Sequence, residues 1–258
     1  MKRLGASYWE GLPLGPGVEL LTKDVNGVFA LGKPDGVLSH PNSPRDEPRS
    51  LLTAPYQMEG EYFEWRPDGE PADQRAYLLN RLDSGTSGVL LVTSSEPLAQ
   101  TLRLQFKQQK VRKLYQALVF GAPTPPVQVW RDRLAIQKRD GVVRTETAGN
   151  VPSESQIRVL KIYQGIPPLA LIQLEPKTGR SHQLRVQCST RHLPIVGDAT
   201  YGNFRANREF ARSTGLKRLF LHSSETQFSY LWQGRTWSFR ARADLPAAFE
   251  EGVRDVRR

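Results

Sequence analysis

A short apolar run with one carboxylate at its entrance constrains this chain more than any other feature. Residues Val89 to Val92 are β-branched or aliphatic, which predicts a strand buried in the core. The preceding residues Ser84 to Ser87 are Ser, Gly and Thr only, which predicts a turn. Asp83 therefore stands at the mouth of a core strand, beside small residues that let a ligand approach the backbone. An aspartate that only ties the turn is the alternative interpretation.

Length and cysteine content narrow the class of protein. A chain of 258 residues can bury a sizeable core, which fits one domain with short decorations. We expect no membrane span, because no apolar run reaches about 18 residues. The charged start, Met1 to Gly5, lacks a following apolar segment, so we expect a cytoplasmic protein. Cys188 is the only cysteine, which excludes an internal disulfide and a cysteine zinc site, and its apolar neighbours predict a core residue.

The charge of the chain is unevenly distributed. The net charge of +10 predicts a polyanionic partner, although such a charge can also serve solubility alone. Residues 101–144 contain ten basic and two acidic side chains, whereas residues 1–75 contain eight basic and twelve acidic ones. The basic excess follows the Asp83 strand, where it could form a surface that tracks phosphates. A solvated helix face remains the alternative for any single lysine there.

Local patterns predict both strands and helices. Strands are predicted at residues 28–31, 37–38, 114–120, 157–163, 169–175, 226–232 and 235–240. A helix is predicted at 97–109, where Leu98, Leu102 and Phe106 share one face, and another at 181–189. The remaining segments are an irregular arm packed by Tyr8 and Trp9, an acidic excursion at 42–75 around a possible edge strand, and a hairpin excursion at 127–150.

Six stretches of the chain carry a more specific signal. They are Gly32–Pro41, Arg81-Leu82-Asp83 with Thr86-Ser87-Gly88, Lys113–Val119, Lys177–Arg185, Pro194–Asp198 with Tyr201-Gly202, and Leu219–His222. In this order they resemble the motifs of the RluA-type pseudouridine synthases, over about residues 20 to 246. The chain departs from the family at Asn80, where a histidine is common.

The resemblance implies a fold and a domain arrangement. The expected fold is an α+β pseudouridine synthase domain, with a bent, mostly antiparallel mixed sheet flanked by helices and loops and a catalytic cleft across the sheet. We expect an N-terminal arm at 1–19, the catalytic domain at 20–250 and a basic C-terminal tail at 251–258. We expect no N-terminal S4 domain of the kind that some relatives carry, because the segment before residue 20 is too short for one.

The resemblance also implies an activity and three catalytic residues. Isomerising uridine to pseudouridine breaks the bond between base and sugar and rejoins the base through carbon, which needs an ionised carboxylate but no metal or cofactor. A buried carboxylate stays charged only beside a cation, and a guanidinium can bind it in two-pronged fashion. By resemblance, Asp83 is the catalytic carboxylate, Arg185 its partner, and Tyr115 packs against the target base.

The expected RNA contacts are Arg81, Lys113, Lys177, Arg180 and His182. An enzyme that acts on a base in folded RNA must take it out of the stack, and Arg81 is spaced to fill the gap that remains. Arg81 as a scaffold ion-pair residue is the alternative, and a solvated charge is the alternative for Lys177. We interpret His182 as a structural or hydrogen-bonding residue rather than a general base.

Two other classes of function remain open at this stage. A non-catalytic RNA-binding or ribosome-assembly protein would not need Asp83, Tyr115 and Arg185 together. A hydrolase of nucleosides or phosphoesters would need a second carboxylate or metal ligands near the motif. The sequence specifies neither the RNA, ribosomal or transfer, nor the uridine. We expect no membrane partner and a monomer.

Overall fold

The chain folds into two compact parts. The computed structural model describes residues 6–139, 142–147 and 149–254. The first part comprises the described residues of Met1–Val111 and Glu225–Ala243, and the second those of Arg112–Ser224 and Asp244–Arg258. The sequence-based catalytic domain at 20–250 spans both parts and stays a prediction.

The first part is built on strands that pair with antiparallel neighbours. Its strands are β1 (Glu19–Lys23), β2 (Val28–Lys33), β3 (Tyr56–Gln57), β4 (Tyr62–Trp65), β5 (Gln74–Leu78), β6 (Ser87–Thr93), β13 (Arg235–Arg242) and β12 (Leu221–Trp232) from Glu225 onward. Their order is β3-β4-β5-β6-β12, with β2 paired to β6, β1 to β2 and β13 to β12. The β12–β13 hairpin turns at Gln233-Gly234 as predicted.

Strand β6 forms the centre of this part. Every residue of β6 and of its antiparallel neighbour β2 is buried, as expected for an apolar run at the middle of a sheet. The predicted strand at 37–38 was wrong: Leu38 makes only an isolated bridge to Ser50. The turn at Gly36, with φ of 83°, lets the chain reverse after Lys33.

Three short helical segments complete the first part: α1 (Ala6–Glu10), the 3-10 helix η1 (Pro44–Arg49) and α2 (Glu96–Lys107). The arm expected to be irregular contains α1, although Tyr8 and Trp9 pack on Phe29 as an anchored arm requires. Helix α2 is confirmed and buries Leu98 and Leu102. Ser95 precedes it, but the Ser95 side chain makes no capping hydrogen bond.

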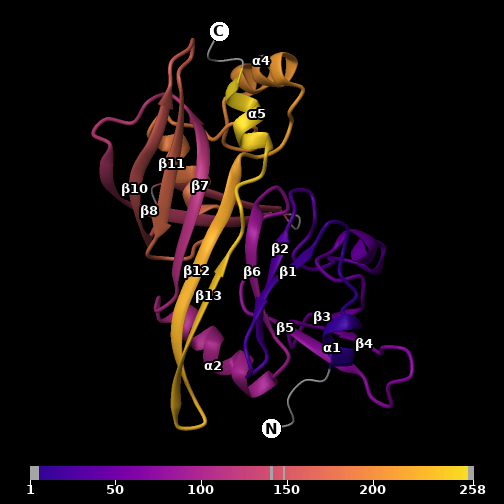
Figure 1. Ribbon diagram of the computed structural model, residues 1–258. Helices are drawn as coiled ribbons and strands as arrows, with labels where there is room; N and C mark the ends of the chain where they lie inside the picture. The colour runs from indigo at the N-terminus through magenta and orange to yellow at the C-terminus, as the bar shows by residue number, and fades with distance from the viewer. Residues whose placement is uncertain (1–5, 140–141, 148, 255–258) are drawn as a thin grey trace. The chain divides into compact units, whose positions relative to one another are not determined.

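The second part is a set of long antiparallel strands that lie side by side in Figure 1. They are β7 (Arg112–Phe120), β8 (Val127–Arg139), β9 (Val142–Thr147), β10 (Val151–Tyr163), β11 (Leu169–Pro176) and the first four residues of β12. Their order is β12-β7-β11-β10-β8-β9. The predicted hairpin at 127–150 is confirmed as β8 and β9, and the predicted pair after it as β10 and β11.

Helices of the second part are α3 (Gln183–Thr190), α4 (Phe204–Thr214) and α5 (Ala248–Arg254). Figure 1 shows α4 beside α5. Helix α4 was not predicted; the Asn203 side chain caps it by accepting from the Ala206 amide at 3.0 Å, and Gly215 ends it in the left-handed region. Residues 251–254 of the predicted basic tail belong to α5, and the rest of that tail lies outside the described residues.

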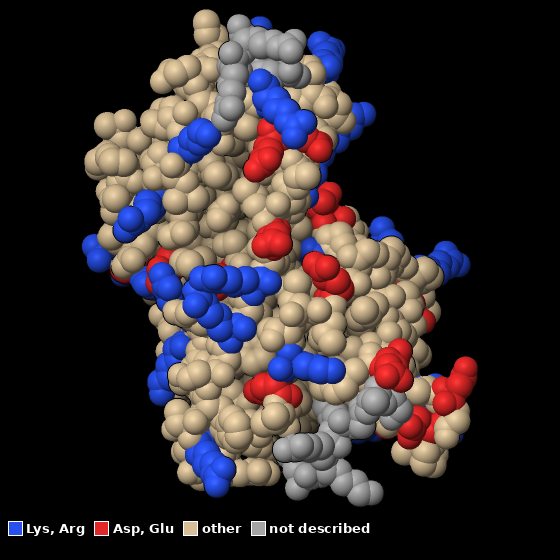
Figure 2. Space-filling model, in the orientation of Figure 1, with Lys and Arg blue, Asp and Glu red and all other residues tan. Residues whose placement is uncertain are grey.

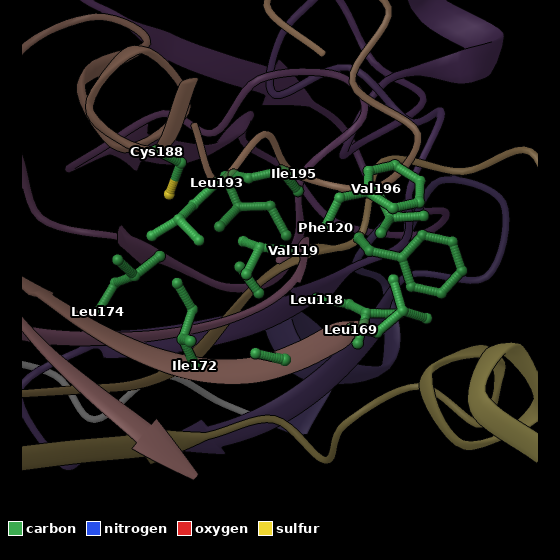
Figure 3. Close-up of a cluster of buried hydrophobic side chains, with 14 of the residues drawn as sticks. Leu118, Val119, Phe120, Leu169, Ile172, Leu174, Cys188, Leu193, Ile195 and Val196 are labelled. Atoms are coloured by element: carbon green, nitrogen blue, oxygen red, sulfur yellow. The ribbon is translucent and has the colours of Figure 1, made fainter. Parts of the chain in front are cut away.

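The core of the second part lies under β7 and β11. Figure 3 shows Leu118, Val119 and Phe120 of β7 together with residues of the loop after α3, and Val119 forms a bridge to Ile195. Cys188 of α3 is fully buried in this cluster, and burial raises the pKa of its thiol. Cys188 is therefore a core residue, as predicted.

The two parts together give the α+β class expected from the sequence. Paired strands make up most of each part, and the described helices are short. Within the described ranges, no helix is long and apolar enough to cross a membrane.

Candidate active site

The turn that carries Asp83 is held on both sides of that residue. The buried Ser39 hydroxyl donates to the Leu82 carbonyl at 2.7 Å and accepts from the Leu82 amide at 3.0 Å. On the other side, the Gly36 amide donates to the Ser84 carbonyl at 2.8 Å. Within the turn, the Thr86 amide donates to the Asp83 carbonyl at 3.0 Å. Asp83 itself is half-buried at the entrance of β6, as the sequence predicts.

Lys33, the last residue of β2, pins the same turn. Its side chain is 1% exposed, and its amine donates to the carbonyls of Pro34 at 2.9 Å, Val37 at 2.6 Å and Ser84 at 2.9 Å. A buried ammonium needs such partners, because an unpaired charge is expensive to bury. Lys33 therefore ties the β2 turn to the residue that follows Asp83.

Asn80 takes a structural role in the same region. Its side-chain oxygen accepts from the Leu91 amide at 2.8 Å, and the neighbouring Leu79 amide donates to the Leu91 carbonyl at 3.0 Å. Asn80, which stands where the family commonly has a histidine, thus binds the segment that leads to Asp83 to strand β6.

Arg81 is exposed beside this turn. Its side chain is 58% exposed, and Nη1 lies 3.4 Å from Nε2 of His40 and 4.0 Å from a carboxylate oxygen of Glu61. These distances are longer than those of a close charge-assisted hydrogen bond. The guanidinium is held loosely.

In the second part, β7 carries two of the predicted site residues. Lys113 and Tyr115 are two positions apart, so their side chains leave the same face of the strand. Tyr115 stands opposite Leu174 of β11 and packs against the core cluster. Burial lowers the pKa of the Lys113 amine, which lies at the Gly179 turn: a Cβ added at Gly179 would be 3.4 Å from Nζ.

Arg185 of α3 is buried against a carboxylate that the sequence analysis did not assign. Its Nε donates to one oxygen of Asp198 at 2.8 Å and its Nη2 to the other at 2.7 Å. The amides of Thr200 and Tyr201 also donate to Asp198, at 2.8 and 2.9 Å. Burial raises the pKa of the Asp198 carboxyl, but Arg185 and these amides outweigh it and hold that pKa below its usual range.

Tyr201 joins Arg185 to His182. The Arg185 guanidinium lies over the Tyr201 ring at 5.1 Å, and the Tyr201 hydroxyl is 2.8 Å from Nδ1 of His182. That hydroxyl also accepts from the Thr145 amide of β9 at 2.9 Å. His182 has a left-handed backbone with φ of 53° at the start of α3, so the network fixes an uncommon conformation. His182 thus makes a side-chain hydrogen bond here, and its role stays a prediction.

The two remaining predicted contacts lie at the turn between β11 and α3. Lys177 forms an ion pair with Glu175, which also binds Arg112 through two nitrogens at 3.1 and 3.2 Å. The Arg180 amide donates to the Gln183 side chain at 3.1 Å, and Arg180 Nε is 3.4 Å from the Pro152 carbonyl. Both side chains are partly exposed, which suits contact with a ligand.

The predicted residues thus fall into two groups. The first part places Arg81 next to Asp83, and the second part brings Arg185 and His182 together through Tyr201. The pairing of Asp83 with Arg185 involves one residue of each part and stays a prediction. Figure 2 shows Lys and Arg side chains gathered over the strands around β7. Among the described residues, no group of three His, Cys, Asp or Glu side chains is placed to hold a metal ion.

The sequence analysis missed three residues that hold the site: Ser39, Lys33 and Asp198. Lys33 and Asp198 carried a recognisable signal, because each is a single charge that closes an apolar segment. Ser39 carried none, since an exposed serine in a turn looks the same in sequence.

Known proteins are similar to this chain in sequence. A profile of the family described as RNA pseudouridylate synthase matches residues 27–190. The tRNA pseudouridine synthase C of Yersinia pestis is 31% identical over 240 residues, which cover 89% of this chain and 88% of that protein. The ribosomal large subunit pseudouridine synthase C of Vibrio vulnificus is 35% identical over 153 residues, covering 59% of this chain and 47% of that protein.

A solved structure shares the fold. Human RNA pseudouridylate synthase domain containing 4 aligns with a TM-score of 0.66 at 22% identity, over 92% of each chain. The profile covers more than half of the chain and contains four of the six motif stretches, those from Gly32 to Arg185. The chain belongs to the RNA pseudouridylate synthase family.

Proposed function

We propose that this protein isomerises a uridine to pseudouridine in a structured transfer or ribosomal RNA, with Asp83 as the catalytic carboxylate. The relatives described above are named as synthases of tRNA and of large-subunit rRNA, which supports both substrate classes. The cytoplasmic location and the monomeric state expected from the sequence belong to the same proposal.

The reaction sets the requirements for the site. The N1–C1′ bond of uridine breaks, the base turns and a C5–C1′ bond forms. C5 then loses a proton and N1 gains one, so the product is an isomer of uridine. The step needs an ionised carboxylate beside the glycosidic bond, which either adds to the nucleotide or removes a sugar proton. Asp83 has the chemistry for both routes.

Arg185 is proposed to keep Asp83 ionised. A guanidinium has five N–H donors, so one that binds Asp198 through Nε and Nη2 has the capacity to bind a second carboxylate. Asp198 would then act as a positioning residue, because it fixes the plane of the guanidinium before RNA arrives. A preorganised cation needs no rearrangement during the reaction.

The β7 residues are proposed to receive the base. Tyr115 and Lys113 share a face of the strand, so an aromatic ring and a cation are presented together. The ring can pack on the uracil while the amine contacts a phosphate. Lys177, Arg180 and His182 at the start of α3 extend this contact along the backbone of the RNA.

Arg81 is proposed to take the place of the flipped base. Taking a base out of the stack costs roughly a few kcal/mol, and a planar guanidinium that stacks in the gap offsets part of that cost. Exposure of the Arg81 side chain supports this role, since a buried group could not enter RNA.

The anchoring of the Asp83 turn is the observation that carries the proposal. Buried Ser39 and Lys33 hold the backbone carbonyls of Leu82 and Ser84, on the two sides of Asp83. A turn whose only task is to connect two segments does not need a buried amine and hydroxyl. A carboxylate that must meet a glycosidic bond does need a fixed backbone.

The test uses cells that lack this protein. Pseudouridines in their total RNA are mapped by carbodiimide-dependent primer extension, after complementation with the native protein, Asp83→Asn or Asp68→Asn. Asp68 is an exposed aspartate of the first part, so its variant makes the same change of charge outside the site. We expect one or more sites to be lost in the deleted cells and restored by the native protein and Asp68→Asn only.

Two outcomes would overturn the proposal. If no site is lost, the protein does not make pseudouridine in that RNA pool. If Asp83→Asn restores the site, another group carries the chemistry.

A further inference from the structure

Two side chains from other segments of the first part contact Arg81. His40 follows the β2 turn, and Glu61 stands in the acidic excursion, between β3 and β4. Neither was assigned a role by the sequence analysis, which described the excursion only as an acidic segment around a possible edge strand. Both contacts are made to the same nitrogen of the guanidinium, Nη1.

His40 presents a lone pair to Arg81. Its Nδ1 lies 3.0 Å from the Pro41 carbonyl, which can only accept, so in the neutral imidazole we assign the ring hydrogen to Nδ1. Nε2 is then an acceptor, and it faces Arg81 Nη1 at 3.4 Å. The ring is kept in this orientation by stacking on Tyr56, with ring centroids 4.8 Å apart and planes 11° apart.

Glu61 is held in place by a second arginine. Arg103 of α2 donates from Nη2 to the carbonyls of Gly60 at 3.1 Å and Glu61 at 3.0 Å, and its Nε lies 3.6 Å from the Glu61 carboxylate. Glu61 has a left-handed backbone with φ of 51°. Helix α2 thus fixes an uncommon turn, which carries a carboxylate to 4.0 Å from Arg81.

The contacts restrain Arg81 without locking it. Distances of 3.4 and 4.0 Å at an exposed side chain make weak interactions, which RNA can replace. An arginine has many rotamers, and choosing one in advance lowers the entropy lost when the side chain enters RNA. Contacts that are directional but weak can hold Arg81 in one orientation in the free protein and still release it when RNA binds.

We propose that His40 and Glu61 are positioning residues that hold Arg81 ready for structured RNA and thereby set the preference of the enzyme for structured over unpaired substrates. The inference rests on the proposed role of Arg81. It assigns the acidic excursion a function in substrate choice, in which the Glu61 carboxylate acts on Arg81 and not on RNA.

The experiment compares two RNAs that contain the same target uridine, one folded and one a short single strand. The readout is the ratio of kcat/KM on the folded RNA to kcat/KM on the short one. His40→Phe keeps a ring that can stack on Tyr56 but removes the acceptor, and Glu61→Gln removes the charge. We expect each to lower the ratio about three- to fivefold, the range of a weak exposed interaction.

Matched variants separate positioning from structure. His40→Gln supplies a side-chain oxygen that can accept from Arg81, so it should restore most of the ratio. Glu64→Gln removes a carboxylate from the same excursion, but Glu64 binds Arg75 at 2.7 Å and should leave the ratio unchanged. In an Arg81→Ala background, His40→Phe and Glu61→Gln should have no further effect on the ratio.

The proposal fails if His40→Phe and Glu61→Gln have the native melting temperature and keep the native ratio. It also fails if these two substitutions lower the ratio as much in the Arg81→Ala background as in the native protein. These failures differ from failure of the proposed function, which appears as no lost site in the deleted cells or as activity that survives Asp83→Asn. If the native protein modifies neither RNA, the ratio of the two association constants (folded over short), measured by fluorescence anisotropy, replaces the kinetic ratio and is expected to fall in the same variants.

Discussion

Arg185 and Arg81 are the same residue type in two opposite settings. Arg185 has a side chain 10% exposed and binds Asp198 through two nitrogens, whereas the Arg81 side chain is 58% exposed and makes one-nitrogen contacts at 3.4 and 4.0 Å. Burial strengthens the first pair, because few water molecules screen it, and exposure weakens the second. The difference shows that the same residue type can supply a fixed charge where it is buried and a mobile planar guanidinium where it is exposed.

The largest expected effect comes from removing the carboxylate that fixes Arg185. Asp198→Ala leaves a buried guanidinium without its bidentate partner, which typically costs about 3–5 kcal/mol of unfolding free energy. Urea denaturation followed by circular dichroism measures this loss. The control is Glu209→Ala in α4, whose exposed pair with Arg205 should cost less than about 0.5 kcal/mol. Equal stability of the two variants would remove the contrast between buried and exposed pairs.

Exchanging arginine for lysine sharpens the same contrast. Arg185→Lys keeps the charge but cannot reproduce the two parallel hydrogen bonds to Asp198, so we expect a loss of roughly 1.5–3 kcal/mol. Arg81→Lys has no bidentate pair to lose and should stay within about 0.5 kcal/mol of the native protein. Thermal and urea unfolding of both variants provides the comparison. A loss at position 81 as large as that at 185 would contradict it.

Acid should weaken the buried pair selectively. Because the pKa of Asp198 in the folded protein lies below its ordinary value of 3.8, its contribution to stability is complete above that value and declines as the pH falls through the folded pKa. A pKa that is lower by one in the folded than in the unfolded protein corresponds to about 1.4 kcal/mol of unfolding free energy. The difference in unfolding free energy between native protein and Asp198→Asn should therefore be largest near neutral pH and shrink below about pH 4. A difference that widens in acid would reverse the sign of this linkage.

The expected effect of Arg81→Ala on stability is also small. An exposed side chain with weak contacts contributes about 0–1 kcal/mol, so the melting temperature should move by only a few degrees at most. The same variant should lose modification of folded RNA more than that of a short unpaired RNA. Stable protein with altered substrate preference would separate the two arginines by function. An equal loss of modification on both RNAs would instead favour the alternative that Arg81 is a scaffold ion-pair residue.

Features encoded within a few residues were predicted correctly. The dipeptide Gln233-Gly234 indicates a tight turn, and β12 and β13 pair across it. The four-residue spacing of Leu98 and Leu102 indicates α2, and both residues are buried there. Helix α4 escaped prediction although it has the local cap Asn203, because only two of its eleven residues are buried and most of the others are polar or charged.

Features that depend on distant residues could not be read from the sequence. The partner of Arg185 stands thirteen positions later, beyond a loop whose path no periodic pattern describes. The serine that holds Leu82 is separated from it by 43 positions. The resemblance marked the segments containing Asp198 and Ser39 but not their contacts, since those contacts arise only when the segments pack. The pairing of Arg185 with Asp83 remains a prediction of the same kind.

The buried amine of Lys33 has a consequence for the chemistry of the protein surface. An amine reacts with acylating reagents through a free electron pair, but the three hydrogens of Lys33 point into three carbonyl groups and its side chain is 1% exposed. Brief labelling of the folded protein should therefore modify exposed lysines and spare this one. A label on Lys33 would appear only in molecules in which the Asp83 turn has opened. The labelled fraction, measured by peptide mass spectrometry, therefore reports how often this turn opens.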